Sequence, residues 1–182
     1  GPGELSDATV ALDWLQSVNP EARQCWIAGY SFGAWIGLQL LMRRPDINNF
    51  IAVSPPANEK DFSFLAPCPT SGLIVQGGAD EIVNPQSVST LAKRLNVQRN
   101  VQVDFALIEE GDHMYNNHLV DLYKIVGNYV IGAMQKKAPQ KKRRGRRKKI
   151  EMQEDQEPLL LEDESMDGEA DAAEDFDEED EE

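Results

Sequence analysis

The stretch that decides the fold is CWIAGYSFGAWIGL, residues 25–38. An apolar, strand-like run leads into Gly29-Tyr30-Ser31-Phe32-Gly33, and an apolar, helix-like run follows, which is the G-x-S-x-G pattern in a strand–turn–helix setting. We expect Ser31 on a sharp turn of strained backbone, with Gly29 and Gly33 leaving room for the strand and the helix to close around it. Its hydroxyl would then lie at a helix N-terminus, which favours a developing negative charge. The alternative is a Gly/Ser turn without chemistry.

The net charge of −14 is unevenly distributed along the 182 residues. Residues 1–135 carry 8 basic and 14 acidic side chains, residues 136–149 carry 10 basic ones, and residues 151–182 carry 18 acidic ones. The total length suits one domain. We therefore divide the chain into a folded domain, residues 1–135, and a basic-then-acidic tail, residues 136–182. The tail has too few apolar residues to bury a core, and we expect it to be disordered.

The rest of the composition narrows the class of protein. Cys25 and Cys68 are the only cysteines, too few for a disulfide framework, and they favour a reducing compartment. No apolar run approaches 18 residues and no signal peptide is visible, so we expect a cytoplasmic protein without a transmembrane segment. We find no Gly-rich phosphate loop and no cluster of His, Cys and carboxylate side chains at ligand spacing. The sequence therefore predicts neither a cofactor nor a metal.

Helix-like and strand-like patterns alternate along residues 1–135. The first predicted helix covers residues 7–17, with Ser6 as its cap and an apolar stripe that includes Val10, Leu12, Trp14 and Leu15. The other predicted elements are strands over 24–28, 50–53, 72–76 and 101–108 and helices over 32–42, 86–95 and 118–135. Because most of the strands are apolar throughout, they predict an α/β fold: three layers, α/β/α, around a mostly parallel sheet.

Three residues with reactive side chains follow predicted strands. Ser31, Asp80 and His113 each come just after a strand end. Reactive groups collect at the carboxyl ends of parallel strands, so we expect these three side chains to meet. A serine hydroxyl is a poor nucleophile near neutral pH and needs an adjacent base, which in turn needs an orienting carboxylate. The three residue types therefore indicate nucleophilic catalysis.

Two of these positions have competitors. Glu81 and Asp112 are carboxylates close to Asp80 in sequence, although Asp112 is better explained as a turn residue. His118 is the only histidine besides His113, and its alternative role is to cap the last helix.

Three motifs stand in order along the chain: GYSFGAW at 29–35, GGADEIVNP at 77–85 and GDHMY at 111–115. Together they resemble the α/β-hydrolase superfamily, most closely small bacterial hydrolases of the dienelactone-hydrolase and predicted-esterase type, and the order serine, acid, histidine matches that superfamily. The resemblance covers about residues 1–135. It implies that Ser31 is the nucleophile, Asp80 the triad acid and His113 the general base. It also implies that the backbone N–H of Phe32 is one donor of the oxyanion hole.

Aromatic and sulfur side chains adjoin the expected nucleophile and base. Tyr30, Met114 and Tyr115 are expected to form walls of the substrate pocket. Trp26 and Trp35 are expected to pack in the core rather than to contact substrate.

The chain departs from the superfamily at its start. A complete α/β-hydrolase begins with several strands that have no counterpart here, including the loop after the third strand that usually supplies the second oxyanion donor. This chain begins at the helix before the nucleophile strand. Loss of one oxyanion donor alone lowers the rate by about 10²–10³. We therefore expect the parent protein to be a serine hydrolase and this chain by itself to be weakly active or inactive.

Three functions fit these motifs. The first is a serine hydrolase that cleaves a small ester, thioester or lactone through an acyl-enzyme, as a monomer or a homo-oligomer. The second is a hydrolase-like scaffold without catalysis, whose charged tail mediates binding. The third is peptide-bond or C–C-bond hydrolysis on the same fold, because loops rather than the fold set the substrate. In each case the basic block 136–149 either contacts nucleic acid or an anionic surface, or is simply solvated.

Overall fold

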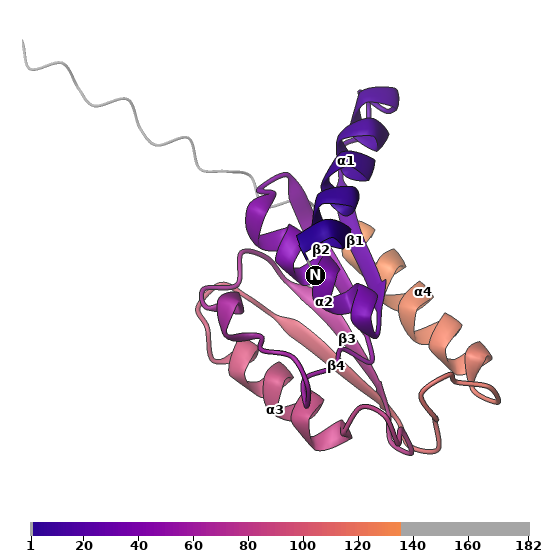
Figure 1. Cartoon of the computed structure of the whole chain (residues 1–182). Coiled ribbons are helices and arrows are strands. Elements are labelled where there is room, and N and C mark those ends of the chain that lie inside the picture. Colours follow the sequence, from indigo (N-terminus) through magenta and orange to yellow (C-terminus); the bar gives the residue numbers. More distant parts are fainter. Residues whose placement is uncertain (1, 136–182) are drawn as a thin grey trace, which may run out of the picture. The chain divides into compact units, whose positions relative to one another are not determined.

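The computed structural model describes residues 2–135 (Figure 1). In chain order the elements are α1 (Pro2–Val18), β1 (Cys25–Tyr30), α2 (Phe32–Arg43), β2 (Ile47–Val53), the short 3₁₀ helix η1 (Ser63–Leu65), β3 (Gly72–Gly77), α3 (Pro85–Asn96), β4 (Val103–Ile108) and α4 (Leu119–Gln135). The four strands and four helices that the sequence predicts are therefore all present. The predicted tail, including the basic block 136–149, lies outside the described residues.

The four strands form one fully parallel sheet in the order β1-β2-β3-β4. Because each connection steps to the next strand in the same direction, right-handed crossovers place α2, η1 and α3 on the same face of the sheet. Figure 1 shows α1, α2 and α3 over that face and α4 behind the opposite one. The predicted α/β/α layering is confirmed.

Alternate residues of the strands face two separate apolar cores. Phe50, Ala52 and Ile74 belong to the larger core under α1, α2 and α3, and their neighbours Ile51 and Val75 belong to the smaller core under α4. Two of the three tryptophans follow this division as partly buried side chains. Trp35 packs against the larger core and Trp26 against the smaller one, so their predicted packing role is confirmed. No helix within residues 2–135 is long and apolar enough to cross a membrane.

The first helix differs from its prediction in its start and its buried face. It begins at Pro2, so Ser6 lies inside α1 and does not cap it; proline suits a first helical position, where the missing N–H would have no partner. Leu5 and Leu12, seven residues apart on one side, are the buried apolar residues of α1. The other three residues of the predicted stripe are 51–65% exposed: Val10, Trp14 and Leu15. The prediction was wrong because α1 carries two apolar stripes, and its pattern does not show which one meets α2.

Candidate active site

The turn between β1 and α2 has the strained geometry that the sequence predicts. Ser31 has φ 51° and ψ −122°, a backbone conformation that residues other than glycine adopt rarely. Its N–H donates to the C=O of Val53 at 2.8 Å, and its own C=O accepts from the N–H groups of Ala34 (3.0 Å) and Trp35 (3.4 Å). Contacts to β2 on one side and to the first turn of α2 on the other therefore over-determine the strained residue.

The close approach of β1 and α2 at this turn depends on one of its two glycines. A Cβ at Gly29 would lie 2.4 Å from the carbonyl oxygen of Gly33 and 2.6 Å from backbone atoms of Ala34. A Cβ at Gly33 would have no atom within 4 Å. The prediction that both glycines make room is therefore right for Gly29 and wrong for Gly33, whose missing side chain would point into open space.

Ser31, Asp80 and His113 meet at the carboxyl edge of the sheet, as the sequence predicts. The Oγ of Ser31 lies 3.1 Å from Nε2 of His113, and Nδ1 of His113 lies 2.8 Å from Oδ2 of Asp80. Because a carboxylate only accepts hydrogen bonds, Nδ1 carries the ring proton and Nε2 is left to accept the proton of the serine hydroxyl. Chemically, this arrangement can deprotonate a serine and hold the resulting imidazolium against a carboxylate.

The carboxylate of Asp80 has a fully buried side chain and accepts four hydrogen bonds. Oδ1 accepts from the backbone N–H groups of Ile82 (2.9 Å) and Val83 (2.8 Å), and Oδ2 accepts from Nε2 of Gln76 (3.0 Å) and from His113. Burial alone would raise the pKa of Asp80, but these hydrogen bonds outweigh it and hold the pKa below its usual value. Asp80 is therefore ionised near neutral pH.

The loops that carry Asp80 and His113 are fixed to each other by their backbones. The N–H of Ala79 donates to the C=O of Gly111 at 3.0 Å. A Cβ on Gly77 would lie 2.3 Å from the same carbonyl oxygen, so only glycine permits this approach. The glycines of the second and third motifs therefore allow the loops that carry Asp80 and His113 to lie close together.

The competing residues have other roles in the structure. Asp112 accepts from the backbone N–H of Asn116 (3.0 Å) and from its side chain (2.8 Å), and so holds the turn after His113, as expected for a turn residue. Nδ1 of His118 lies 3.5 Å from a carboxylate oxygen of Asp121 at the start of α4. Glu81 is exposed.

Tyr30 and Met114, two expected pocket walls, lie beside His113. The Tyr30 hydroxyl donates to the C=O of His113 at 2.9 Å and lies 3.2 Å from the sulfur of Met114. The rings of Tyr30 and His113 are tilted against each other with centroids 5.2 Å apart. Burial, with a smaller contribution from the negative charges of Asp80 and Asp112, raises the pKa of Tyr30, so its hydroxyl stays a donor near neutral pH. Both side chains are open to solvent on their outer side, 41% and 60% exposed.

Tyr115, the third expected pocket wall, is instead buried beneath the site. Its side chain is 1% exposed and belongs to the core on the α4 face. Its hydroxyl lies 2.8 Å from Oγ of Ser54, a fully buried residue at the end of β2. Burial raises the pKa of Tyr115 to about 12. The prediction was wrong because the turn at 112–115 directs the ring inward, which adjacency to the histidine does not reveal.

Phe32 is the first residue of α2 and directly follows the nucleophile candidate. At that helical position a backbone N–H has no acceptor within the helix, so it is available to an incoming oxyanion. Its ring is 40% exposed and lies 5.7 Å from the ring of Trp35, centroid to centroid. Within residues 2–135, no group of three or more His, Cys, Asp or Glu side chains lies close enough together to hold a metal ion.

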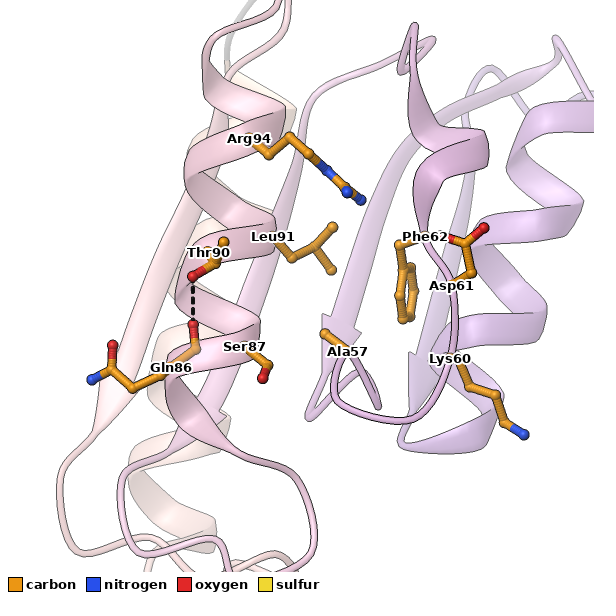
Figure 2. Close-up of a pocket in the computed structure, with 9 residues that line it drawn as sticks. All are labelled: Ala57, Lys60, Asp61, Phe62, Gln86, Ser87, Thr90, Leu91 and Arg94. Atoms are coloured by element: carbon orange, nitrogen blue, oxygen red, sulfur yellow. Dashed lines mark hydrogen bonds between the residues drawn. The ribbon is translucent and has the colours of Figure 1, made fainter.

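A separate pocket of about 380 Å³ lies between the loop after β2 and α3 (Figure 2). Phe62 and Leu91, both buried, contribute its apolar part. Figure 2 shows Arg94 extended from α3 toward the loop, whereas Lys60 points away from that helix, and Lys60 lies 5.5 Å from the ring centroid of Trp35. None of the three side chains at the sheet edge lines this pocket.

The fold and the three motifs agree with a comparison of the chain with known families. The sequence profile of the dienelactone hydrolase family matches residues 4–143. The chain belongs to the dienelactone hydrolase family. The resemblance that the motifs indicate is therefore confirmed at the level of the family.

Individual relatives of this dienelactone hydrolase family member come from several bacteria. An uncharacterized protein of Rickettsia prowazekii (strain Madrid E) is 48% identical over 135 residues, which cover 72% of this chain and 57% of that protein. The crystal structure of a protein of unknown function from Agrobacterium tumefaciens is 46% identical with a TM-score of 0.72, over 74% of this chain and 62% of that one. An α/β serine hydrolase without a lid from Xanthomonas campestris is 29% identical with a TM-score of 0.62, over 72% and 57% of the two chains. The chain thus spans about 57–62% of the length of these relatives.

Proposed function

We propose that this member of the dienelactone hydrolase family is a serine hydrolase that cleaves a small ester, thioester or lactone through an acyl-enzyme. One observation carries the proposal: Ser31, His113 and Asp80 form a continuous hydrogen-bonded series, and its serine sits on a strained turn at a helix N-terminus. Strained backbone is common at active sites, and a serine, a base and an orienting acid are the parts that acyl transfer requires. The proposal concerns this chain and any longer protein that contains it.

The roles of the three residues follow from the proton positions. Ser31 Oγ attacks the carbonyl carbon of the substrate while its proton passes to Nε2 of His113, and the carbonyl oxygen becomes an oxyanion beside the N–H of Phe32. Collapse of this intermediate breaks the bond to the leaving group, which takes the proton from His113. Water then attacks the acyl-enzyme by the same route in reverse and restores the free hydroxyl. Asp80 stays ionised throughout and stabilises the imidazolium.

The substrate class is part of the same proposal. Tyr30, Phe32 and Met114 expose apolar surface next to the nucleophile or the base, which suits a small acyl group without charge. The Phe32 N–H is one oxyanion donor, and removal of a donor from such a site lowers kcat by about 10²–10³. We therefore expect the chain to turn over activated esters such as p-nitrophenyl esters. The cytoplasmic location, a homo-oligomer and nucleic-acid contact through residues 136–149 stay predictions.

A fluorophosphonate probe tests the proposal directly, because it forms a covalent bond only with an activated serine. We expect one equivalent of probe on the full chain, located on Ser31 by peptide mass spectrometry, and none on Ser31→Ala. Ser87→Ala, which removes a half-buried serine of α3, is the matched control and should label like the unmodified chain. Absence of labelling on the unmodified chain, or equal labelling of Ser31→Ala, would overturn the proposal. A panel of p-nitrophenyl esters, thioesters, lactones and amides then separates the substrate classes.

A further inference from the structure

Gln76 is the one polar side chain among the fully buried residues of β3, and it lies directly below the loop that carries Asp80. Its Nε2 is 3.0 Å from Oδ2 of Asp80, 3.1 Å from the C=O of Gly77 and 3.2 Å from the C=O of Val83. All three partners are acceptors, so the nitrogen rather than the oxygen of the amide must face them. The two N–H groups of Gln76 are therefore shared among the carboxylate of Asp80 and the backbone carbonyls at the two ends of the segment 77–83.

The oxygen of the Gln76 side-chain amide argues against packing as the reason for a glutamine at this position. Oε1 of Gln76 is buried and accepts no hydrogen bond from a protein group among the described residues. A buried acceptor without a partner destabilises a fold, and a methionine of similar length would avoid that cost. The side chain therefore combines a disadvantage for stability with a direct contact to Asp80, which points to a role in the site.

The contact places Gln76 and His113 on the same carboxylate oxygen. Oδ1 of Asp80 is held by backbone N–H groups, whereas Oδ2 accepts from the two side chains, His113 at 2.8 Å and Gln76 at 3.0 Å. Rotation of the carboxylate away from His113 would thus break the Gln76 contact as well. We propose that Gln76 is a positioning residue, which fixes the Asp80 carboxylate and its loop in the orientation that aligns His113 with Ser31. This inference rests on the proposed function, because alignment matters only if His113 acts as the base.

Substitution by methionine removes the donor and keeps the approximate size. In Gln76→Met we expect kcat with p-nitrophenyl acetate, and the rate of fluorophosphonate labelling, to fall by about 10- to 100-fold, since hydrogen bonds to charged groups and ångström-scale misplacements have effects of this order. KM should change little, because the side chain at position 76 is 0% exposed and cannot contact substrate. Ile74→Val is the matched control: it loosens the same face of the same strand two residues earlier without a polar contact, and should retain the unmodified rate.

Substitution by glutamate tests the direction of the hydrogen bond through pH. A glutamate at position 76 faces Asp80 and, beyond it, His113, while Tyr30 and Tyr115 are the other titratable groups that interact with the Asp80 charge. Both tyrosines have raised pKa values and stay neutral below pH 10. A protonated glutamate can donate to Asp80, whereas an ionised one repels it. The pH–rate profile of Gln76→Glu should therefore descend at alkaline pH where the unmodified chain stays level.

The outcomes separate this inference from the function on which it rests. If the unmodified chain does not label at Ser31, the proposed function fails and the inference fails with it. If the unmodified chain labels and Gln76→Met labels within about twofold of it, the inference is wrong and the function stands. Circular dichroism verifies folding, and if Gln76→Met does not fold, the profile of Gln76→Glu decides: a new descending limb supports the positioning role, and a profile like that of the unmodified chain refutes it.

Discussion

The substitution Gly29→Ala tests whether the strained turn depends on the closeness of β1 to α2. The added methyl would meet the carbonyl oxygen of Gly33 at 2.4 Å and backbone atoms of Ala34 at 2.6 Å. Neither neighbour is the flexible end of a side chain, so the strand and the helix must separate. Gly33→Ala is the natural control, because it makes the same chemical change in the same motif where nothing lies within 4 Å.

The magnitude follows from these contacts. To restore ordinary van der Waals separation, β1 and α2 must move apart by about 1 Å. Overpacking in a core costs about 1–3 kcal/mol, and we expect Gly29→Ala at the upper end, about 3 kcal/mol, because the clash is with backbone. Gly33→Ala replaces a helical glycine of α2 and should instead gain up to about 1 kcal/mol. A displacement of 1 Å at Ser31 would also lower its reactivity by about 10².

Urea unfolding and probe labelling measure the two consequences separately. With m-values of about 1–3 kcal/mol/M, the midpoint of Gly29→Ala should fall by about 1 M or more, while that of Gly33→Ala stays the same or rises. Labelling of Ser31 by a fluorophosphonate should slow in Gly29→Ala alone. If Gly29→Ala loses less than about 1 kcal/mol, or the two variants shift the free energy of unfolding alike, the close approach does not hold the turn together.

Two further predictions concern buried polar groups. Tyr115→Phe removes the hydrogen-bond partner of the Ser54 hydroxyl and should lower the free energy of unfolding by about 1–2 kcal/mol in urea titrations. Adding Ser54→Ala should recover part of this loss. If the effects of the two substitutions on the free energy of unfolding simply add in the double variant, the two hydroxyls are not paired. The second concerns Asp80, whose pKa is lowered in the folded chain, so its stabilising effect is present above its unfolded pKa of about 3.9 and is lost as the pH falls through the folded value. Asp80→Asn should therefore destabilise the chain most near neutral pH and progressively less below pH 4. By analogy with the corresponding change in another Ser-His-Asp enzyme, it should also lower kcat by about 10⁴-fold. A difference in the free energy of unfolding that is constant with pH would refute the ionised, hydrogen-bonded carboxylate.

The elements of the fold could be predicted because their signals are local. Each strand is an apolar run that ends at a polar or glycine-containing turn, and each predicted boundary except the start of α1 lies within three residues of the observed one. The buried face of α1 could not be predicted, because Leu5 and Leu12 on one side and Trp14 on the other are equally apolar in sequence. Only the contact with α2, which is a property of the whole fold, decides between the two sides.

The site shows the same division between local and distant information. Ser31, Asp80 and His113 could be placed together from sequence, since a parallel sheet brings the carboxyl ends of its strands to one edge. Gln76 was missed, although an amide next to the end of an otherwise apolar strand is a visible signal. Tyr115 was placed on the wrong side, because the direction of a side chain in a turn depends on backbone angles that composition does not reveal; its φ is 54°.

β2 contributes none of the three side chains of the candidate site, but its end contacts the segments that carry two of them. β2 lies between β1 and β3, and the site draws its serine from the end of β1, its acid from the loop after β3 and its histidine from the loop after β4. The end of β2 nevertheless contacts both sides: the C=O of Val53 accepts from the N–H of Ser31, and the side chain of Ser54 contacts the hydroxyl of Tyr115 two residues beyond His113. Ser31 and the turn after His113 therefore contact neighbouring residues at the end of β2, Val53 and Ser54. Together with the hydrogen bond from Ala79 to Gly111, these contacts hold the turns from which the side chains of Ser31 and His113 approach to 3.1 Å.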